Sequence, residues 1–208
     1  MKPTINEVLN LFIGKDTLRP VMLQPNLENG FVYATNGYCL IKIPSKLLTG
    51  EFSKVEKFPN CESAIGTAVL LEKPLTISIS KLADLINTIP KEPIYKECKT
   101  CDGEGVVECN LGHDHFCEDC DGDGTLKEKI GEKINSNNNP LKIGVAHYSP
   151  VYLEYIIKAC QSQDIESFVI THQGHNTAMI AKVNDILILA MPITYSSESH
   201  RTEYIYSE

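Results

Sequence analysis

The sequence predicts an α+β fold in which short helices pack on antiparallel sheets, interrupted by an inserted segment of different composition. Short apolar runs are separated by Asn-Gly turns, as is typical of antiparallel hairpins. Stretches with helical spacing of apolar residues precede such runs on both sides of the insert. The insert, residues 91–133, holds 6 lysines and 12 acidic residues, and therefore −6 of the chain's net charge of −8.

The first helix is expected over residues 4–13 (TINEVLNLFI). Thr4 is placed to cap this helix, and Glu7, three residues later, completes the pattern of a capping box. Three strand-like pieces follow over residues 19–44, because Asn-Gly pairs break this stretch at two points and favour tight hairpin turns. The breaks are Asn29-Gly30 and Asn36-Gly37. Half of a small β-rich unit is thereby predicted.

A similar order of elements recurs further along the chain. Residues 75–90 begin with alternating apolar residues up to Ile79 and continue with helical spacing, which predicts a strand and a short helix. Residues 142–149 predict another strand, and Ser149-Pro150 supplies an N-cap and the first position of the next helix. Three more strands are predicted at residues 166–172, 176–183 and 185–193.

The composition, with 42% hydrophobic residues, is that of a soluble globular protein. The first ten residues, MKPTINEVLN, lack the apolar run of a secretory signal, and no stretch of about 18 apolar residues could cross a membrane. We therefore expect a cytoplasmic protein with no membrane partner. Its 19 basic and 27 acidic residues provide no general attraction to nucleic acid.

The cysteines of the insert follow a metal-ligand spacing. In a reducing cytosol, closely paired cysteines favour metal binding over disulfides. Two C-x-x-C pairs separated by 15 residues match the pattern of a tetrahedral zinc site. The predicted ligands of this single ion are Cys98, Cys101, Cys117 and Cys120. Since four sulfurs leave no coordination position open, the zinc is expected to be structural.

Other interpretations of the insert stay open from the sequence alone. The acidic stretch from Asp119 matches the early positions of a calcium-binding EF-hand loop, but position twelve is Ile130 instead of a glutamate. A redox or disulfide pair is disfavoured, because neighbouring acids raise the pKa of a thiol. The residues between the two cysteine pairs are either further metal ligands or parts of a solvated hairpin tip. They include Cys109, His113, Asp114 and His115.

Glycines follow both cysteine pairs at the same spacing, so C-x-x-C-x-G-x-G occurs twice, at residues 98–105 and 117–124. Such a chain segment can turn tightly around a metal, because glycine tolerates positive φ. The repeat resembles the cysteine-rich module of DnaJ-type co-chaperones, whose full form has four such motifs and two zinc ions. Two motifs imply one zinc ion here. The sequence holds no HPD motif, so a complete co-chaperone is not expected.

A second resemblance concerns the chain on both sides of the insert. Residues 34–37 read Ala-Thr-Asn-Gly before a hydrophobic strand, and Met191-Pro192 ends the last predicted strand. Over residues 1–60 and 140–195 the chain resembles a domain of the bacterial DNA polymerase sliding clamp, in which A-T-D-G and M-P are common at these places. The resemblance implies DNA-clamp-like helices on antiparallel sheets, with an inserted zinc-binding hairpin module.

This resemblance divides the chain into a discontinuous clamp-like domain, residues 1–94 and 134–208, and an inserted four-cysteine module, residues 95–133. It implies a non-catalytic protein of nucleic-acid metabolism, in DNA replication, that binds protein partners, and it leaves open binding to DNA and assembly into a homo-oligomer. Clamp partners occupy a groove formed partly by the last strand, which implies partner-binding roles for Met191, Pro192 and Ile193.

Two observations bear on these functional expectations. The helices expected at residues 4–13, 81–89 and 150–161 carry few cations, so charge does not support DNA binding. The alternative is a chaperone-like or adaptor protein whose zinc module is itself the partner-binding surface. No nucleotide-binding loop or catalytic triad spacing is recognisable, and we expect no enzyme. The remaining cysteines, Cys39, Cys61 and Cys160, are predicted to be core thiols, and His172 and His175 to lie in an exposed loop.

Overall fold

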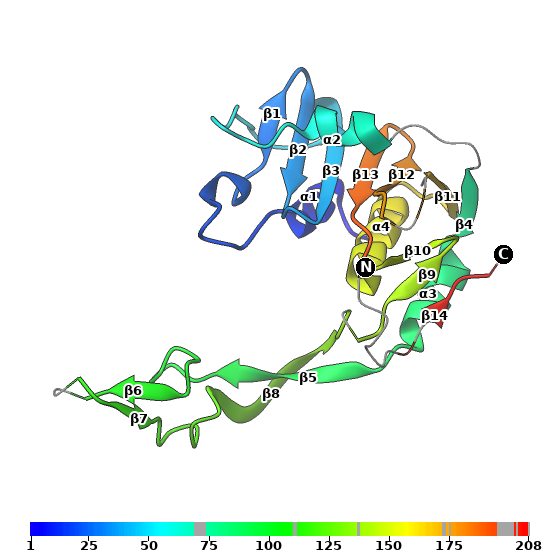
Figure 1. Cartoon of the computed structure of the whole chain (residues 1–208). Coiled ribbons are helices and arrows are strands. Elements are labelled where there is room, and N and C mark those ends of the chain that lie inside the picture. Colours follow the sequence, from blue (N-terminus) through cyan, green and yellow to red (C-terminus); the bar gives the residue numbers. More distant parts are fainter. Residues whose placement is uncertain are drawn as a thin grey trace. The chain divides into compact units, whose positions relative to one another are not determined.

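The computed structural model describes residues 1–68, 74–109, 112–136, 138–171, 174, 176–194, 202 and 204–207. The chain forms two compact units (Figure 1). The first, called the host, comprises Met1–Ile89 and Ser136–Glu208, and the second, called the arm, comprises Pro90–Asn135. None of the described helices is long and apolar enough to cross a bilayer. The predicted loop histidines, His172 and His175, lie outside the described residues.

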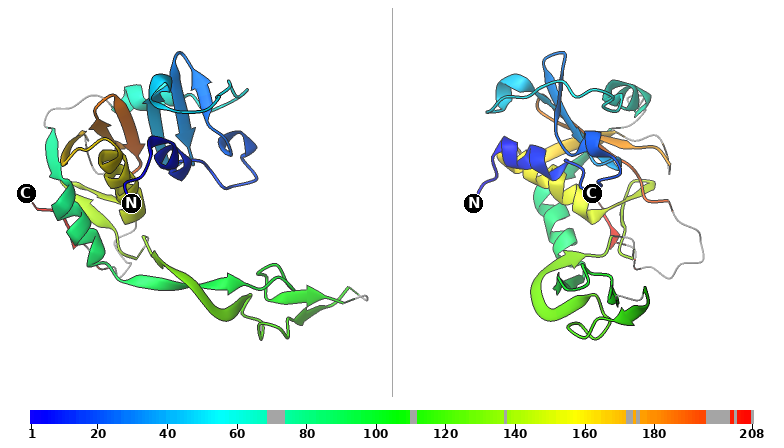
Figure 2. Two further views of the ribbon diagram at one scale, coloured as in Figure 1. Left: turned by 180° about the vertical axis from the view of Figure 1, so that it is seen from behind. Right: turned by 90° about the vertical axis from the view of Figure 1, so that its left-hand side faces the viewer.

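The host is built on a seven-stranded sheet in which all neighbouring strands are antiparallel (Figures 1 and 2). In spatial order the strands are β1 (Asn26–Glu28), β2 (Phe31–Thr35), β3 (Cys39–Pro44), β13 (Ile186–Ala190), β12 (Met179–Val183), β11 (Ser167–Thr171) and β4 (Leu75–Ser78). The strands β1-β2-β3 and β11-β12-β13 are two meanders. They join where β3 pairs with β13, with Ile41 opposite Ile188. The predicted α+β class with antiparallel sheets is confirmed.

Residues with a left-handed backbone conformation turn the chain between the strands. Asn29 and Gly30 between β1 and β2 have φ of 51° and 79°, and Gly37 between β2 and β3 has φ of 90°. In the second meander, Asn184 between β12 and β13 has φ of 52°. Glycine adopts this region without a steric cost and asparagine at a small one, so these residues permit short hairpins. The two predicted Asn-Gly breaks are thus turns.

Helix α1 (Ile5–Leu11) begins at the predicted capping box. The Glu7 N–H donates to the Thr4 hydroxyl at 3.2 Å, and the Thr4 N–H donates to the Glu7 carboxylate at 2.7 Å. These bonds satisfy donors that the first helical turn leaves without partners. Helix α1 contacts α4 (Pro150–Ser162), which also contacts α3 (Ile79–Asn87) and β12. At the α1–α4 contact, the rings of Phe12 and Tyr155 meet edge to face with centroids 5.4 Å apart.

The sheet carries apolar residues on both faces. One face forms a cluster with helix α2 (Cys61–Ala68); its buried members are Tyr33, Leu40, Cys61, Ile65, Ile180 and Leu189. We call this the outer face. Successive strand residues point to opposite faces. The alternate residues therefore face the other side, and they are at most 1% exposed: Ala34, Ile41, Ala181 and Ile188. The predicted core thiols Cys39, Cys61 and Cys160 are all buried.

An ion pair at the outer face predicts a small pH dependence of stability. Lys42 Nζ lies 2.5 Å from Glu62 Oε1, which also accepts a hydrogen bond from the Tyr33 hydroxyl. Bonds from Lys42 and Tyr33 lower the pKa of Glu62 from its usual 4.5. The stabilisation is therefore fully present above the unfolded-state pKa, and it is lost as pH falls through the lower pKa of the folded state.

We expect Glu62→Gln to lower the free energy of unfolding by less than about 1 kcal/mol at pH 7, because half of the Glu62 side chain is exposed. The difference from wild type should shrink at pH 3. Urea unfolding at both pH values measures this, with the exposed Glu51→Gln as the control. An equal difference at both pH values would show that the Glu62 charge does not contribute.

Two predicted strands differ in the structure. Residues 142–149 form a hairpin of β9 (Leu141–Ile143) and β10 (Ala146–Tyr148), since Gly144 takes φ of 60° and turns the chain. The first strand piece is reduced to β1, because Pro20 begins the 3-10 turn η1 (Pro20–Met22) and proline cannot donate to a strand ladder. Strand β14 (Tyr204–Ile205), which the sequence did not predict, pairs with β9 in parallel.

Helix boundaries also differ in detail. Ile79, expected at the end of a strand, is the first residue of α3, and its N–H donates to the Glu166 carbonyl at 3.0 Å. Ser149 precedes α4 as predicted, but its hydroxyl bonds to the Ser136 hydroxyl at 2.8 Å and makes no side-chain cap. Helix α2 and the 3-10 turn η2 (Ser45–Leu47) were not predicted.

The arm consists of two antiparallel ribbons with a cysteine cluster in the chain that connects them. Strand β5 (Lys91–Glu97) pairs with β8 (Thr125–Ile134), with register shifts on either side of Tyr95. Beyond the cysteines, β6 (Val106–Glu108) pairs with β7 (Asp114–Phe116). Val107 and Leu126 pack against the cysteine cluster. Among the described residues, the cysteine cluster is thus the main buried contact where the two ribbons of the arm join.

Candidate metal centre

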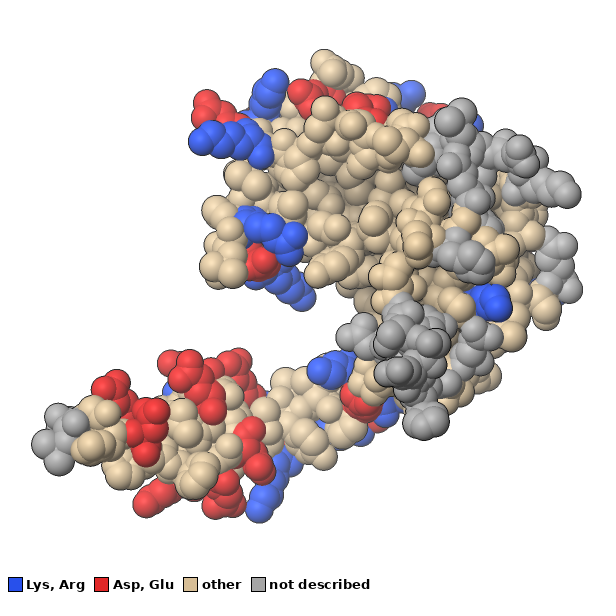
Figure 3. Space-filling view, in the orientation of Figure 1, with Lys and Arg blue, Asp and Glu red and all other residues tan. Residues whose placement is uncertain are grey.

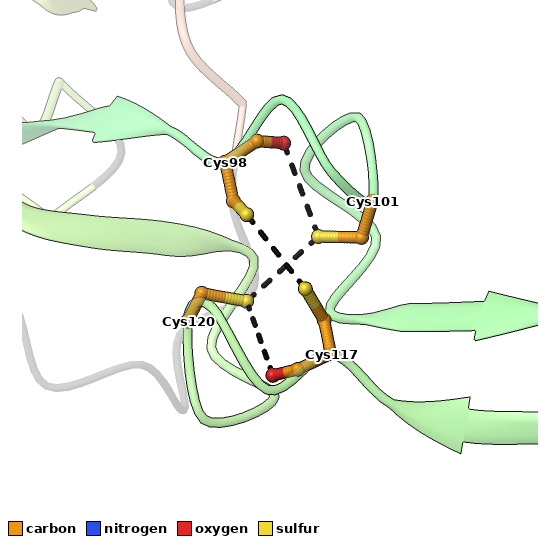
Figure 4. Close-up of side chains that lie close together, drawn as sticks. All are labelled: Cys98, Cys101, Cys117 and Cys120. Carbon is orange, nitrogen blue, oxygen red and sulfur yellow. Dashed lines mark hydrogen bonds between the residues drawn. The ribbon is translucent and has the colours of Figure 1, made fainter.

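Four cysteine sulfurs converge in the arm (Figure 4). The Sγ atoms of Cys98 and Cys117 lie 3.8 Å apart, as do those of Cys101 and Cys120, and all four lie within 4.8 Å of one another. A tetrahedron with zinc–sulfur bonds of about 2.3 Å has edges of about 3.8 Å. The four residues are between 1% and 6% exposed. Their spacing and burial are those of a site that could bind one metal ion.

The two C-x-x-C-x-G-x-G segments have nearly the same local structure. The N–H of Gly103 donates to the Cys98 carbonyl at 3.0 Å, and in the second segment Gly122 donates to Cys117 at 3.1 Å. These glycines have the same φ, 83°. The repeated sequence therefore builds two equivalent turns, and each turn presents two sulfurs to the centre.

The second glycine of each segment donates to a sulfur. The N–H groups of Gly105 and Gly124 lie 3.3 Å from the sulfurs of Cys101 and Cys120. Hydrogen bonds of this kind stabilise the negative charge of a thiolate ligand. The same glycines link the turns, since the Gly105 carbonyl accepts from Cys117 N–H and the Gly124 carbonyl from Cys98 N–H, both at 2.9 Å.

The chain passes too close at these glycines for any side chain. A Cβ added at Gly105 would lie 2.2 Å from the Gly122 carbonyl oxygen, and one at Gly124 would lie 2.2 Å from the Gly103 oxygen. Both contacts involve backbone, which cannot rotate away. Each position also has positive φ, 76° and 73°. The close backbone contact and the positive φ therefore each require glycine, both at position 105 and at position 124.

The four thiols change one another's ionisation, and not all in the same direction. Burial raises the pKa of Cys98, but the backbone N–H groups of Thr100 and Cys101, together with the Cys101 and Cys117 thiols, outweigh this effect and bring it to about 7. Burial, reinforced by the Cys120 and Cys98 thiols, raises the pKa of Cys117 to about 12. A cation at the centre would stabilise all four thiolates, so metal binding would release protons and weaken as pH falls.

The other predicted ligand candidates are not part of this cluster. His113 and His115 are exposed, and Cys109 is half-buried in the same hairpin, where its N–H donates to the His113 carbonyl at 2.9 Å. In the described part of the chain, the four-cysteine group is the one set of three or more His, Cys, Asp or Glu residues that could hold an ion. The acids of the EF-hand-like stretch, Asp119, Asp121 and Asp123, are exposed.

The segment implied as a partner surface follows β13. The Met191 N–H donates to the Tyr38 carbonyl at 2.8 Å, and the Ile193 N–H donates to the His147 carbonyl at 2.7 Å. The Met191 side chain is 42% exposed, whereas Pro192 and Ile193 are half-buried. Backbone bonds thus fix this segment, and Met191 presents an apolar side chain to solvent.

The sequence did not reveal a groove on the outer face of the sheet. Its volume is about 690 Å³. Its apolar lining comes from Phe31, Pro44, Ile180 and Leu187, and its charged lining from Lys42, Lys46, Lys182 and Asp185. The sequence signal for the groove was the pattern along β2, β3, β12 and β13, where residues on both faces are apolar. The groove itself could be recognised only once the neighbouring strands of the sheet were known.

Comparison with protein families found no matching family model, and comparison with curated proteins found no relative. Solved structures do match. The DNA polymerase III beta subunit of Thermotoga maritima has TM-score 0.51 and 9% identity, over 92% of this chain and 64% of that one. The clamps of Bartonella birtlesii and Pseudomonas aeruginosa, both bound to griselimycin, have TM-score 0.50 and identities of 11% and 12%.

Those two matches cover 90% and 91% of this chain and 62% of each clamp. The chain thus spans less than two thirds of the length of these clamps. At such low identities the likeness concerns the fold alone. The mixed α+β architecture of this protein resembles the fold of the DNA polymerase III beta sliding clamps.

Proposed function

We propose that this chain is a non-catalytic, clamp-like protein that takes part in DNA replication by binding other proteins. The clamp-like fold of the host is the observation that carries the proposal. The arm corresponds to the inserted module and serves as a structural element. Because the host helices carry few cations, protein partners and not duplex DNA are its main binding targets.

The metal of the arm is one structural zinc ion held by Cys98, Cys101, Cys117 and Cys120. The sulfur separations of 3.8 Å support this assignment, since they match the edge of a zinc–thiolate tetrahedron. Four thiolates leave no position for water or substrate. The ion would therefore hold the two turns together and would perform no chemistry of its own.

Partner binding is proposed at Met191, Pro192 and Ile193, since exposed Met191 can offer an adaptable apolar contact. The test uses the full chain and the replicative DNA polymerase subunit from the same organism, with affinity measured by biolayer interferometry. Met191→Ala should weaken binding about tenfold. Leu23→Ala is the matched control, because Leu23 is similarly exposed at 41%. Absence of binding by the wild type would refute this role.

One observation favours a second candidate, an adaptor whose arm binds the partner. Phe116 on β7 is 80% exposed, which is unusual for a large aromatic side chain. Under this alternative, Phe116→Ser would abolish binding to the same polymerase subunit while Met191→Ala would leave it unchanged. The two variants therefore separate the candidates.

A further inference from the structure

The outer-face groove has the chemistry of a site for an acidic and apolar segment. Three lysines and one aspartate line it together with apolar side chains. The Lys42 ammonium lies 4.2 Å from the centre of the Phe31 ring, so cation and aromatic face form one surface. Lys182 forms no ion pair with any residue in the described ranges. An incoming carboxylate would therefore find a free cation there.

The arm of this chain carries the complementary surface. Residues 98–124, called the tip, hold eight acidic residues and one lysine. Figure 3 shows Asp and Glu side chains gathered over this part of the arm. Phe116 stands 80% exposed between the acidic neighbours Asp114 and Glu118. The tip thus combines one large apolar side chain with flanking carboxylates.

We propose that the arm tip of one copy docks in the outer-face groove of a second copy, with Phe116 among the apolar side chains and the tip acids facing Lys42, Lys46 and Lys182. The groove volume, about 690 Å³, is ample for an aromatic side chain. Opposite charges favour this pairing and disfavour tip against tip. The inference rests on the metal-held tip proposed above, but it requires no role in replication.

Such a contact is heterologous, because the tip and the groove are different surfaces. Each copy offers one of each, so the chains would join head to tail and either close into a ring or extend. Met191, Pro192 and Ile193 do not line the groove, so a replication partner would not compete for the same residues. Self-association and partner binding can therefore be measured separately.

Sedimentation velocity of the full chain, without partners, tests the proposal over a range of concentrations. We expect a concentration-dependent species larger than one chain, with a midpoint about tenfold higher in 500 mM than in 50 mM salt, since screening weakens charged contacts. A wild-type protein that stays monomeric at all concentrations would overturn the proposal. Binding of an acidic aromatic peptide from another protein in the groove would not rescue it.

Substitutions locate the contact. Phe116→Ser should weaken association about 30-fold, as expected when a central aromatic contact is removed. Asp114→Asn with Glu118→Gln is a second tip variant, and Lys46→Glu with Lys182→Glu is the groove variant. Controls are Ile130→Ser, which removes a 60% exposed apolar side chain from β8, and Lys15→Glu with Lys81→Glu. Association of the tip and groove variants at the wild-type level would contradict the proposal.

A mixture of two variants tests directly whether the tip of one copy meets the groove of another. The groove variant keeps an intact tip, and the Phe116→Ser variant keeps an intact groove. At concentrations where neither variant associates alone, the two together should form a 1:1 complex that grows no further. No complex in the mixture would refute tip-to-groove docking. Metal analysis of each variant, expected at one ion per chain, confirms that a weakened contact does not reflect an unfolded tip.

Discussion

Cys101→Ser will release the metal ion and unfold the arm tip while the host remains folded. The sulfur of Cys101 is one of four that must surround the ion, and it also accepts the Gly105 N–H. Structural zinc binding contributes about 10–16 kcal/mol of apparent free energy in small domains, and little other buried surface holds the tip together. Among the described residues, Val107 and Leu126 are the only other apolar side chains that pack against the cluster.

Metal analysis should find one zinc ion per wild-type chain and almost none in the variant. In amide NMR spectra, resonances of residues 98–124 should collapse to random-coil positions while host resonances persist. Cys109→Ser is the matched control, because this half-buried cysteine belongs to the same arm but lies outside the four-sulfur cluster. A Cys101→Ser protein that keeps a full complement of metal would contradict the proposed ligand set.

Gly105→Ala should also prevent the site from closing, although it removes no ligand. The new Cβ would lie 2.2 Å from the Gly122 carbonyl oxygen, so the two turns would have to separate. Separation would break the 2.9 Å bond from Cys117 N–H to the Gly105 carbonyl and would spread the sulfurs. We expect zinc affinity to fall at least 100-fold in a competition titration with a chromogenic chelator.

Gly112→Ala is a closely matched control for this prediction. Gly112 has the same φ as Gly105, 76°, but among the described residues its added Cβ would meet the flexible end of the Glu108 side chain, at 3.6 Å, and no backbone atom. Both substitutions place an alanine in the left-handed region, which costs about 1–2 kcal/mol. Gly105→Ala alone adds the clash with backbone. Equal zinc affinities for the two variants would show that the close approach of the turns is unimportant.

The features that sequence predicted best are those encoded by neighbouring residues. Cys98 and Cys101 lie on one turn because of their spacing, and the glycines that follow allow that turn. The Asn29-Gly30 and Asn36-Gly37 turns and the Thr4 capping box likewise depend on a few consecutive residues. Local backbone preferences decide such structures, so they can be inferred without knowledge of the fold.

The features that were missed depend on long-range pairing. The outer-face groove exists because β3 lies beside β13, which brings Lys42 opposite Leu187 from distant parts of the chain. The pairing of β14 with β9 is of the same kind. Helix α2 did have a local signal, since the Asn60 side chain accepts the Ser63 N–H at 3.0 Å and caps the helix start. The hairpin turn at Gly144 was likewise visible as a glycine within an apolar run.

X-ray absorption at the zinc edge of the purified full chain identifies the ligands of the ion. The proposal is that four thiolates enclose a single ion and make the arm a structural element. It predicts one zinc ion per chain with four sulfur neighbours at about 2.3 Å. A shell that contains a water oxygen or a histidine nitrogen, or protein that carries no metal, would contradict it.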